Sequence, residues 1–142
     1  MSGSADPSRR VAPEPPATRV PRDGAVSGSA VATVTGWDGA LIAAVSRRLG
    51  HAETGPEVVV DIRGDLDLDT APLAQATVIQ ALDDAPRVCL DLTEVQFFGA
   101  AGLRVILGAR RHAEALGRDF RLSGVHGVTA RILVLAGLSP PY

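Results

Sequence analysis

Three aspartates alternate along one short segment, at Asp65, Asp67 and Asp69. Carboxylates at this spacing could coordinate calcium or take part in phosphoryl transfer. An EF-hand loop that started at Asp65 would need glycine and glutamate where the chain has Thr70 and Ala76. The Asp-x-Asp-x-Thr/Val signature of aspartyl phosphatases also fails at its last position. We therefore interpret the segment as a turn before a helix cap, and we expect Asp65 and Asp67 to contribute to a partner-binding surface.

The other reactive side chains indicate no catalytic or metal site. The histidines, His51, His112 and His126, lack the short spacing of metal ligands. Cys89 is the single cysteine, which excludes an internal disulfide, and its apolar neighbours predict a core position. The chain has neither of the glycine-rich phosphate-binding motifs and no pattern of a catalytic triad. We expect no metal, no cofactor and no enzymatic activity, and therefore a binding module.

A small-residue turn, Gly99-Ala100-Ala101-Gly102, lies between an apolar strand and the longest predicted helix. A helix start leaves about four backbone N–H groups without partners and carries a partial positive charge. We expect Gly99 to permit tight backbone geometry before the helix and Gly102 to permit close approach of a partner. The turn is thus a second candidate binding element.

Strands and helices alternate along the part of the chain that holds both turns. We expect strands over 31–35, 57–63, 87–92 and 119–123, where β-branched and aromatic residues cluster. We expect helices from Asp69 or Thr70 to about 82, from 100 to about 116, and over 128–136. Segment 41–49 is ambiguous between strand and helix, and 51–56 is expected to be a loop. This order predicts an α/β fold with a mixed, mostly parallel β-sheet and helices packed on it.

Periodicity also predicts which side chains face the core. For the first two helices these are Leu73, Ala76, Ile79, Leu82, Leu103, Ile106, Leu107 and Leu116. Trp37 is expected to pack near the first strands. Arg104, Arg111 and Arg118 recur every seven residues, and they form either a solvated face or a stripe for an acidic partner.

Composition limits the classes of function. The chain has 142 residues, of which 46% are hydrophobic, and a net charge of −2, so it lacks the basic excess of a nucleic-acid-binding protein. Its apolar runs are far shorter than the roughly 20 residues of a membrane span, and no apolar segment of signal-peptide length follows the N-terminus. We therefore expect a cytoplasmic protein. Residues 1–28 hold five of the ten prolines and predict a disordered tail before one domain over 29–142.

At four points in order, the chain resembles the STAS domain of bacterial anti-sigma factor antagonists. These points are the turn Gly64-Asp65-Leu66-Asp67, the helix start Asp69-Thr70-Ala71, the strand Val88–Leu92 leading into Phe97-Phe98-Gly99-Ala100-Ala101-Gly102-Leu103, and the closing Ala136-Gly137-Leu138. The resemblance covers about residues 56–138. It implies the STAS-like fold and a partner-switching function, in which the antagonist binds an anti-sigma factor of the serine-kinase type and frees a sigma factor.

The resemblance also implies roles for the residues of the second turn. In the family this turn usually reads aromatic-x-Asp-Ser-x-Gly-Leu, and the partner kinase phosphorylates the serine. Here Gly99 replaces the aspartate and Ala100 replaces the serine, so the usual phosphoacceptor is missing. We expect a partner-binding surface that cannot be phosphorylated at Ala100. Its expected residues are Phe98, Gly99, Ala100, Ala101, Gly102, Leu103 and Arg104, with Asp65 and Asp67.

Other readings of the same residues stay open. Stand-alone STAS subunits that regulate membrane transporters, such as lipid-exporting ABC systems, also lack the phosphorylated serine. A nucleotide-binding or sensory STAS domain and a scaffold in a stress complex are further alternatives. The second turn could also be a compact helix start whose partner surface has been lost.

Overall fold

The computed structural model describes residues 30–142, which form a five-stranded sheet and three helices. The elements in chain order are β1 (Ala30–Thr35), β2 (Leu41–Ala52), β3 (Gly55–Leu66), α1 (Ala71–Asp84), β4 (Arg87–Phe98), α2 (Ala100–Leu116), β5 (Asp119–Ser123) and α3 (Gly127–Leu135). The predicted tail, residues 1–28, lies outside the described part of the chain.

The strands lie in the sheet in the same order as in the chain, from β1 to β5. The pairs β1–β2 and β2–β3 are antiparallel, and the pairs β3–β4 and β4–β5 are parallel. Each parallel connection crosses over through a helix, as parallel pairing requires. The prediction of an α/β fold with a mixed sheet is confirmed, and parallel pairing is confined to the half of the sheet from β3 to β5.

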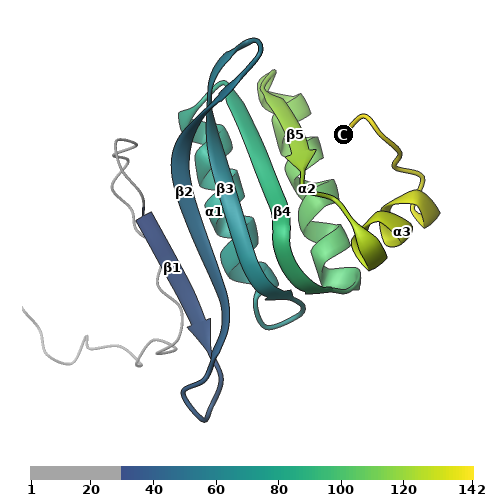
Figure 1. Cartoon of the computed structure of the whole chain (residues 1–142). Helices are drawn as coiled ribbons and strands as arrows, with labels where there is room; N and C mark the ends of the chain where they lie inside the picture. The colour runs from purple at the N-terminus through teal and green to yellow at the C-terminus, as the bar shows by residue number, and fades with distance from the viewer. Residues whose placement is uncertain (1–29) are drawn as a thin grey trace, which may run out of the picture.

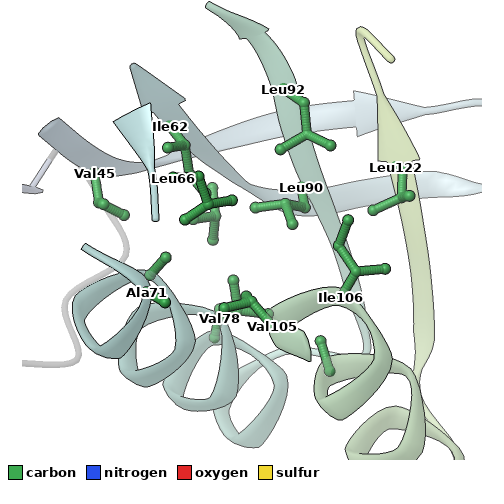
Figure 2. Close-up of a cluster of buried hydrophobic side chains, with 14 of the residues drawn as sticks. Val45, Ile62, Leu66, Ala71, Val78, Leu90, Leu92, Val105, Ile106 and Leu122 are labelled. Carbon is green, nitrogen blue, oxygen red and sulfur yellow. The ribbon is translucent and has the colours of Figure 1, made fainter. Parts of the chain in front are cut away.

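Helices α1 and α2 cover one face of the sheet, whereas α3 lies beside the β5 edge (Figure 1). The core lies between that face and the two helices. Figure 2 shows its side chains pointing toward one another from the sheet and the helices; the labelled ones are Val45, Ile62, Leu66, Leu90, Leu92, Leu122, Ala71, Val78, Val105 and Ile106. Alternate residues of each strand point away from this core, because side chains on a strand alternate between faces.

The face of the sheet without helices is held by ion pairs. The Arg48 Nε lies 2.7 Å from Asp61 Oδ2, and Arg121 binds both carboxylate oxygens of Glu57 at 3.1 and 2.6 Å. The two arginines are nearly half exposed and lie in contact with water above the carboxylates, so the fold needs only one layer of helices.

Several strands have other boundaries in the structure than the sequence predicted. The ambiguous segment 41–49 is strand β2, and the predicted loop 51–56 is a tight hairpin whose residues mostly belong to β2 and β3. Strand β4 continues six residues past its predicted end at Leu92, because Phe97 and Phe98 pair with β3. Helix α2 begins at Ala100 and ends before Gly117 as predicted, and Gly117 is left-handed there.

Some predicted core positions are wrong. On α1, Ala76 is exposed, and the buried face instead includes Ala74, Thr77 and Ala81. On α2, Leu116 is exposed because it lies in the last turn, beyond the part of the helix that packs against the sheet. Trp37 is not a packing residue, because it lies fully exposed in the turn between β1 and β2.

Candidate functional site

The two turns singled out from the sequence meet at one end of the sheet. Strands β3 and β4 are parallel, and Leu66 pairs with Phe98 at their carboxyl ends. The backbone N–H of Gly99 donates to the Leu66 carbonyl at 3.2 Å. The segment that follows Leu66 therefore lies beside the start of α2, and the structure brings the predicted acidic turn and the predicted small-residue turn together.

The acidic turn is held by its own hydrogen bonds. The Thr70 hydroxyl donates to the Asp65 carbonyl at 2.7 Å and accepts from the Asp67 N–H at 2.9 Å. The Asp67 Oδ1 accepts from the N–H groups of Asp69 and Thr70 at 3.0 and 3.3 Å. Thr70 is the N-cap of α1, as one of the two sequence alternatives proposed, but its hydroxyl bonds the preceding turn and not the helix. Asp67 thus shapes the turn, while the Asp65 side chain makes no such bond.

Three of the predicted partner-binding residues lie beneath the surface. Phe98, Ala101 and Gly102 are buried, so they lie beneath the predicted partner-binding surface, and their part in binding stays a prediction. A Cβ at Gly102 would lie 2.8 Å from Phe98 Cε2 and 3.1 Å from Leu66 Cγ. The glycine at this position therefore makes room for the aromatic ring inside the protein, and not for a partner outside it.

The outer layer of the site consists of four other predicted residues. Ala100 and Arg104 are exposed, and Gly99 and Leu103 are partly exposed. Gly99 has φ −114° and ψ −169°, an extended conformation that any residue adopts, so tight geometry does not explain this glycine.

Phe97 is a surface residue that the sequence analysis missed. More than half of its side chain is exposed. A Cβ at Gly99 would lie 3.3 Å from Phe97 Cε1, so the ring lies next to the backbone of the turn. The signal was present in the sequence, since two adjacent aromatics at the end of a strand must point to opposite faces.

The start of α2 carries an uncompensated positive end. No acidic residue lies in its first turn, and no side chain caps it. The partial charge of the helix terminus and the exposed Arg104 therefore act on the same surface. The predicted arginine stripe does not continue along the helix, because Arg118 turns back and donates to the Asp83 carbonyl at 3.4 Å.

Beyond the two turns, the described residues hold a buried thiol and no group of side chains that could bind a metal ion. Cys89 lies in the sheet with its Sγ 3.2 Å from Ser123 Oγ, and burial raises the pKa of its thiol. Within residues 30–142, no group of three or more His, Cys, Asp or Glu side chains could hold a metal ion. None of the three helices there is both long and apolar enough to cross a membrane.

Comparison with known proteins identifies the family. The model of a family described as "Mlab, STAS domain" matches residues 49–140, well over half of the chain. The fold is similar to the crystal structure of an anti-sigma factor antagonist from Mycobacterium paratuberculosis, with a TM-score of 0.55, 23% identity, and coverage of 73% of this chain and 83% of that one. It is also similar to the anti-sigma factor antagonist SpoIIAA in its unphosphorylated form, with a TM-score of 0.54, 21% identity and coverage of 66% and 83%.

The Bacillus cell fate determinant SpoIIAA in its phosphorylated form gives a similar match, with a TM-score of 0.53, 20% identity and coverage of 66% and 86%. At these identities the structures establish a shared fold. The family match covers the elements that form both turns of the candidate site, from the last third of β2 to α3. The chain therefore belongs to the STAS domain family.

Proposed function

We propose that this protein is an anti-sigma factor antagonist that binds an anti-sigma factor through the outer layer of the site described above. The main observation behind the proposal is how the residues at the start of α2 are packed and exposed. Phe98 and Gly102 interlock beneath it, and Ala100 and Arg104 are presented on the outside. A rigid helix start next to a second structured turn is a preorganised surface, which lowers the entropic cost of association.

Three further observations support the proposal. The chain belongs to the STAS family, and its fold matches two structures described as anti-sigma factor antagonists. The partly exposed Asp65 lies at the same end of the sheet as Ala100, where we expect partner contacts from the resemblance to the family. The site is a surface of small and apolar groups with few side chains of catalytic chemistry, which suits protein docking better than catalysis.

The proposal includes a difference in regulation from family members that carry the phosphorylated serine. Ala100 has no oxygen that could accept a phosphoryl group, so this position cannot carry the added charge of about −1.5 to −2 that a phosphoserine brings. We infer that the protein stays competent to bind its partner even when the partner is an active serine kinase. Control of the interaction would then act on the amount of the protein or on a residue elsewhere.

The test measures binding to each serine-kinase-type anti-sigma factor encoded by the source genome, by isothermal titration calorimetry. The informative variant is Ala100→Arg, because Ala100 is exposed and the change leaves the core intact, whereas the buried Ala101 would couple binding to folding. Ala115→Arg is the matched control, since Ala115 is an exposed alanine near the other end of the same helix.

We expect wild type and Ala115→Arg to bind equally and Ala100→Arg to bind at least about tenfold more weakly. In a reconstituted transcription assay, wild type should restore activity to a sigma factor that the anti-sigma factor inhibits. Failure of wild type to bind any such anti-sigma factor would overturn the proposed function. Equal binding by both variants would place the interface elsewhere on the domain.

A second candidate function is that of a regulatory STAS subunit of a membrane transporter, such as a lipid-exporting ABC system. The observation that favours it is the alanine at position 100, since transporter-associated STAS proteins of this type resemble the chain in lacking the serine. The description of the matching family, Mlab, is compatible with this candidate. Co-purification separates the two candidates: a kinase-like partner supports the first function, and a transporter ATPase supports the second.

A further inference from the structure

A hollow of about 300 Å³ opens at the end of the sheet opposite the candidate site. It lies where β3, β4 and β5 begin, beside the β2–β3 hairpin (Figure 1). Sites for small molecules have volumes of about 300–1,000 Å³, so this hollow can hold a small ligand. We call it the arginine pocket, because its polar lining consists of three arginines, two carboxylates and a hydroxyl; these are Arg87, Arg118, Arg121, Glu57, Asp119 and Thr54.

The fold fixes the segments from which the pocket's arginines project. Arg87 opens β4 and pairs with Asp119, which opens the parallel strand β5. The Asp119 N–H also donates to the Pro86 carbonyl at 2.9 Å, which ties the two strand starts together. Arg118 follows the left-handed Gly117 that ends α2, so the turn out of the helix sets its place. The arginines therefore come from different elements and meet at one point.

Two of these arginines hold hydrogen-bond donors that no described residue satisfies. Within residues 30–142, the buried side-chain nitrogen and oxygen atoms without a hydrogen-bond partner are Arg87 Nε and Arg118 Nε, and both residues line the arginine pocket. The Arg87 Nε lies 3.8 Å from Asp119 Oδ2, beyond hydrogen-bond distance. The Arg118 Nη2 donates to the Asp83 carbonyl at a long 3.4 Å. Because buried donors are nearly always bonded, two such donors around one hollow indicate that a ligand supplies the acceptors.

The charges of the arginine pocket favour an anion. Arg121 binds both carboxylate oxygens of Glu57, so that pair is neutral. Arg87 and Arg118 then face one further carboxylate, that of Asp119, which is 80% exposed to water. The pocket therefore has an excess of one positive charge, and this charge lies on the two arginines whose Nε donors lack a partner.

The number of available donors distinguishes between classes of anion. A guanidinium binds an oxyanion through two N–H groups that lie side by side. One such fork occupies both oxygens of a carboxylate, whereas a phosphate group has enough oxygens to bind the forks of both Arg87 and Arg118. The Thr54 hydroxyl offers a further donor. The hollow has room for about ten water molecules, at about 30 Å³ each, which is more than a phosphate group alone fills.

We propose that the arginine pocket binds a small molecule that carries a phosphate group, and that Arg87 and Arg118 hold the phosphate. Because both Nε atoms are buried, each guanidinium turns this edge into the hollow when the ligand binds. The rest of the ligand lies against the partly exposed ring of Phe120, which also lines the hollow. The inference goes beyond the proposed function, since the pocket contains none of the expected partner-binding residues.

The test measures the binding of inorganic phosphate and of phenyl phosphate to the full chain by isothermal titration calorimetry. Acetate at the same ionic strength is the carboxylate probe. The informative variants are Arg87→Gln and Arg118→Gln, which remove the charge and the fork. Arg111→Gln is the matched control, because Arg111 is an exposed arginine of α2 outside the pocket. Circular dichroism melts check that the variants fold alike.

We expect phenyl phosphate to bind wild type more tightly than phosphate does, and acetate to bind more weakly than either. Arg111→Gln should bind like wild type, and Arg87→Gln and Arg118→Gln should lose at least about tenfold in affinity. Arg118→Lys keeps the charge and loses the fork, so it should also bind more weakly than wild type. This variant keeps the test valid if Arg118→Gln unfolds.

Three outcomes would contradict the inference. If wild type binds neither phosphate probe, the arginine pocket is not a phosphate site. If Arg111→Gln loses as much affinity as Arg118→Gln, the anion is attracted by the general charge of the surface and not by the pocket. If phosphate binds as tightly as phenyl phosphate, the site takes the free ion and the larger ligand is overturned. Binding to the anti-sigma factor, tested with Ala100→Arg, is independent of all three.

Discussion

Gly102 and the ring of Phe98 occupy adjoining space beneath the start of α2, where a Cβ on residue 102 would lie 2.8 Å from Phe98 Cε2. The obstacle is a buried ring and not the mobile end of a side chain, so it cannot easily yield. This contact sets the height of the helix start above β4. The position of the exposed residues Ala100 and Arg104 therefore depends on a glycine that is itself buried.

Gly102→Ala should destabilise the protein by about 1–3 kcal/mol through overpacking, although alanine is the better helix former by about 1 kcal/mol. Gly108→Ala is the control on the same helix, because its Cβ would meet only Gln75 Nε2, at 3.7 Å. That change should stabilise the protein by about 0.5–1 kcal/mol. Urea unfolding followed by circular dichroism measures both. A Gly102→Ala variant as stable as Gly108→Ala would show that the ring yields freely.

The buried carboxylate of Glu57 provides a second prediction. Its side chain is 3% exposed and is bound by Arg121, which is itself 45% exposed. Arg121→Ala would leave the charge of Glu57 buried without a partner, at a cost of about 1–3 kcal/mol once solvent near the exposed arginine is taken into account. Adding Glu57→Gln to that variant should restore part of the stability, because the neutral amide removes the uncompensated charge. No recovery in the double variant would count against this account.

The sequence predicted the bounds of helix α2 closely because the signals for them are local. The start at Ala100 and the stop at Gly117 follow from small residues that flank an amphipathic run. Whether each residue is buried or exposed depends on the tertiary structure. Phe98 and Phe97 are alike as residue types, and only the pairing of β4 with β3 decides which of them is buried.

Trp37 is another residue whose burial could not be predicted from the sequence, and here a residue expected to pack is exposed. Its residue type favours the core, but it lies between Gly36 and Gly39 in a turn closed by local hydrogen bonds, which exposes whatever side chain stands there. The joining of the two turns into one site also depended on parallel pairing of β3 and β4. The alternation of strands and helices predicted that β3 and β4 would be parallel. It did not predict which residues of the two strands lie opposite each other, such as Leu66 and Phe98.

Acid should weaken the fold partly through Asp91. Burial opposes ionisation of this carboxyl, but hydrogen bonds from the Thr93 hydroxyl and N–H, at 2.6 and 2.9 Å, and the nearby Arg48 together lower its pKa below the ordinary 3.8. A carboxyl with a lowered folded-state pKa contributes stability above its unfolded pKa, and the contribution is lost as pH falls through the folded value.

Asp91→Asn should therefore be less stable than wild type near neutral pH, and the difference in unfolding free energy should shrink below about pH 4. Urea titrations between pH 7 and pH 3 measure this difference. Thr93→Val is the companion variant, because it removes the hydroxyl donor and keeps the carboxylate. A gap between Asp91→Asn and wild type that stayed constant over the whole range would contradict the assigned cause.

The thiol of Cys89 should be inert in the folded protein. Burial raises its pKa above the ordinary 9.0, against the smaller opposing effects of the hydrogen bond with Ser123 and the charge of Arg121. Since the thiolate is the reactive form, a thiol-specific reagent at pH 8 should label the native protein only as fast as it opens. In denaturant, one thiol per chain should react at once, because Cys89 is the only cysteine. Rapid labelling of the native state would falsify this prediction.

Stability and docking should move in opposite directions at Ala100. The first turn of α2 has neither an acidic residue nor a side-chain cap, so Ala100→Asp places a carboxylate against the positive end of the helix. The exposed position accommodates the change, and the gain should be about 0.3–1 kcal/mol in unfolding free energy. The same carboxylate adds a charge where the proposed partner docks, and it should weaken binding to the anti-sigma factor.

Ala115→Asp, near the negative end of α2, is the control: it should lower stability slightly and leave binding unchanged. If Ala100→Asp instead destabilised the protein, loss of binding by this variant would report unfolding, and the helix terminus could not be an available anion-accepting surface.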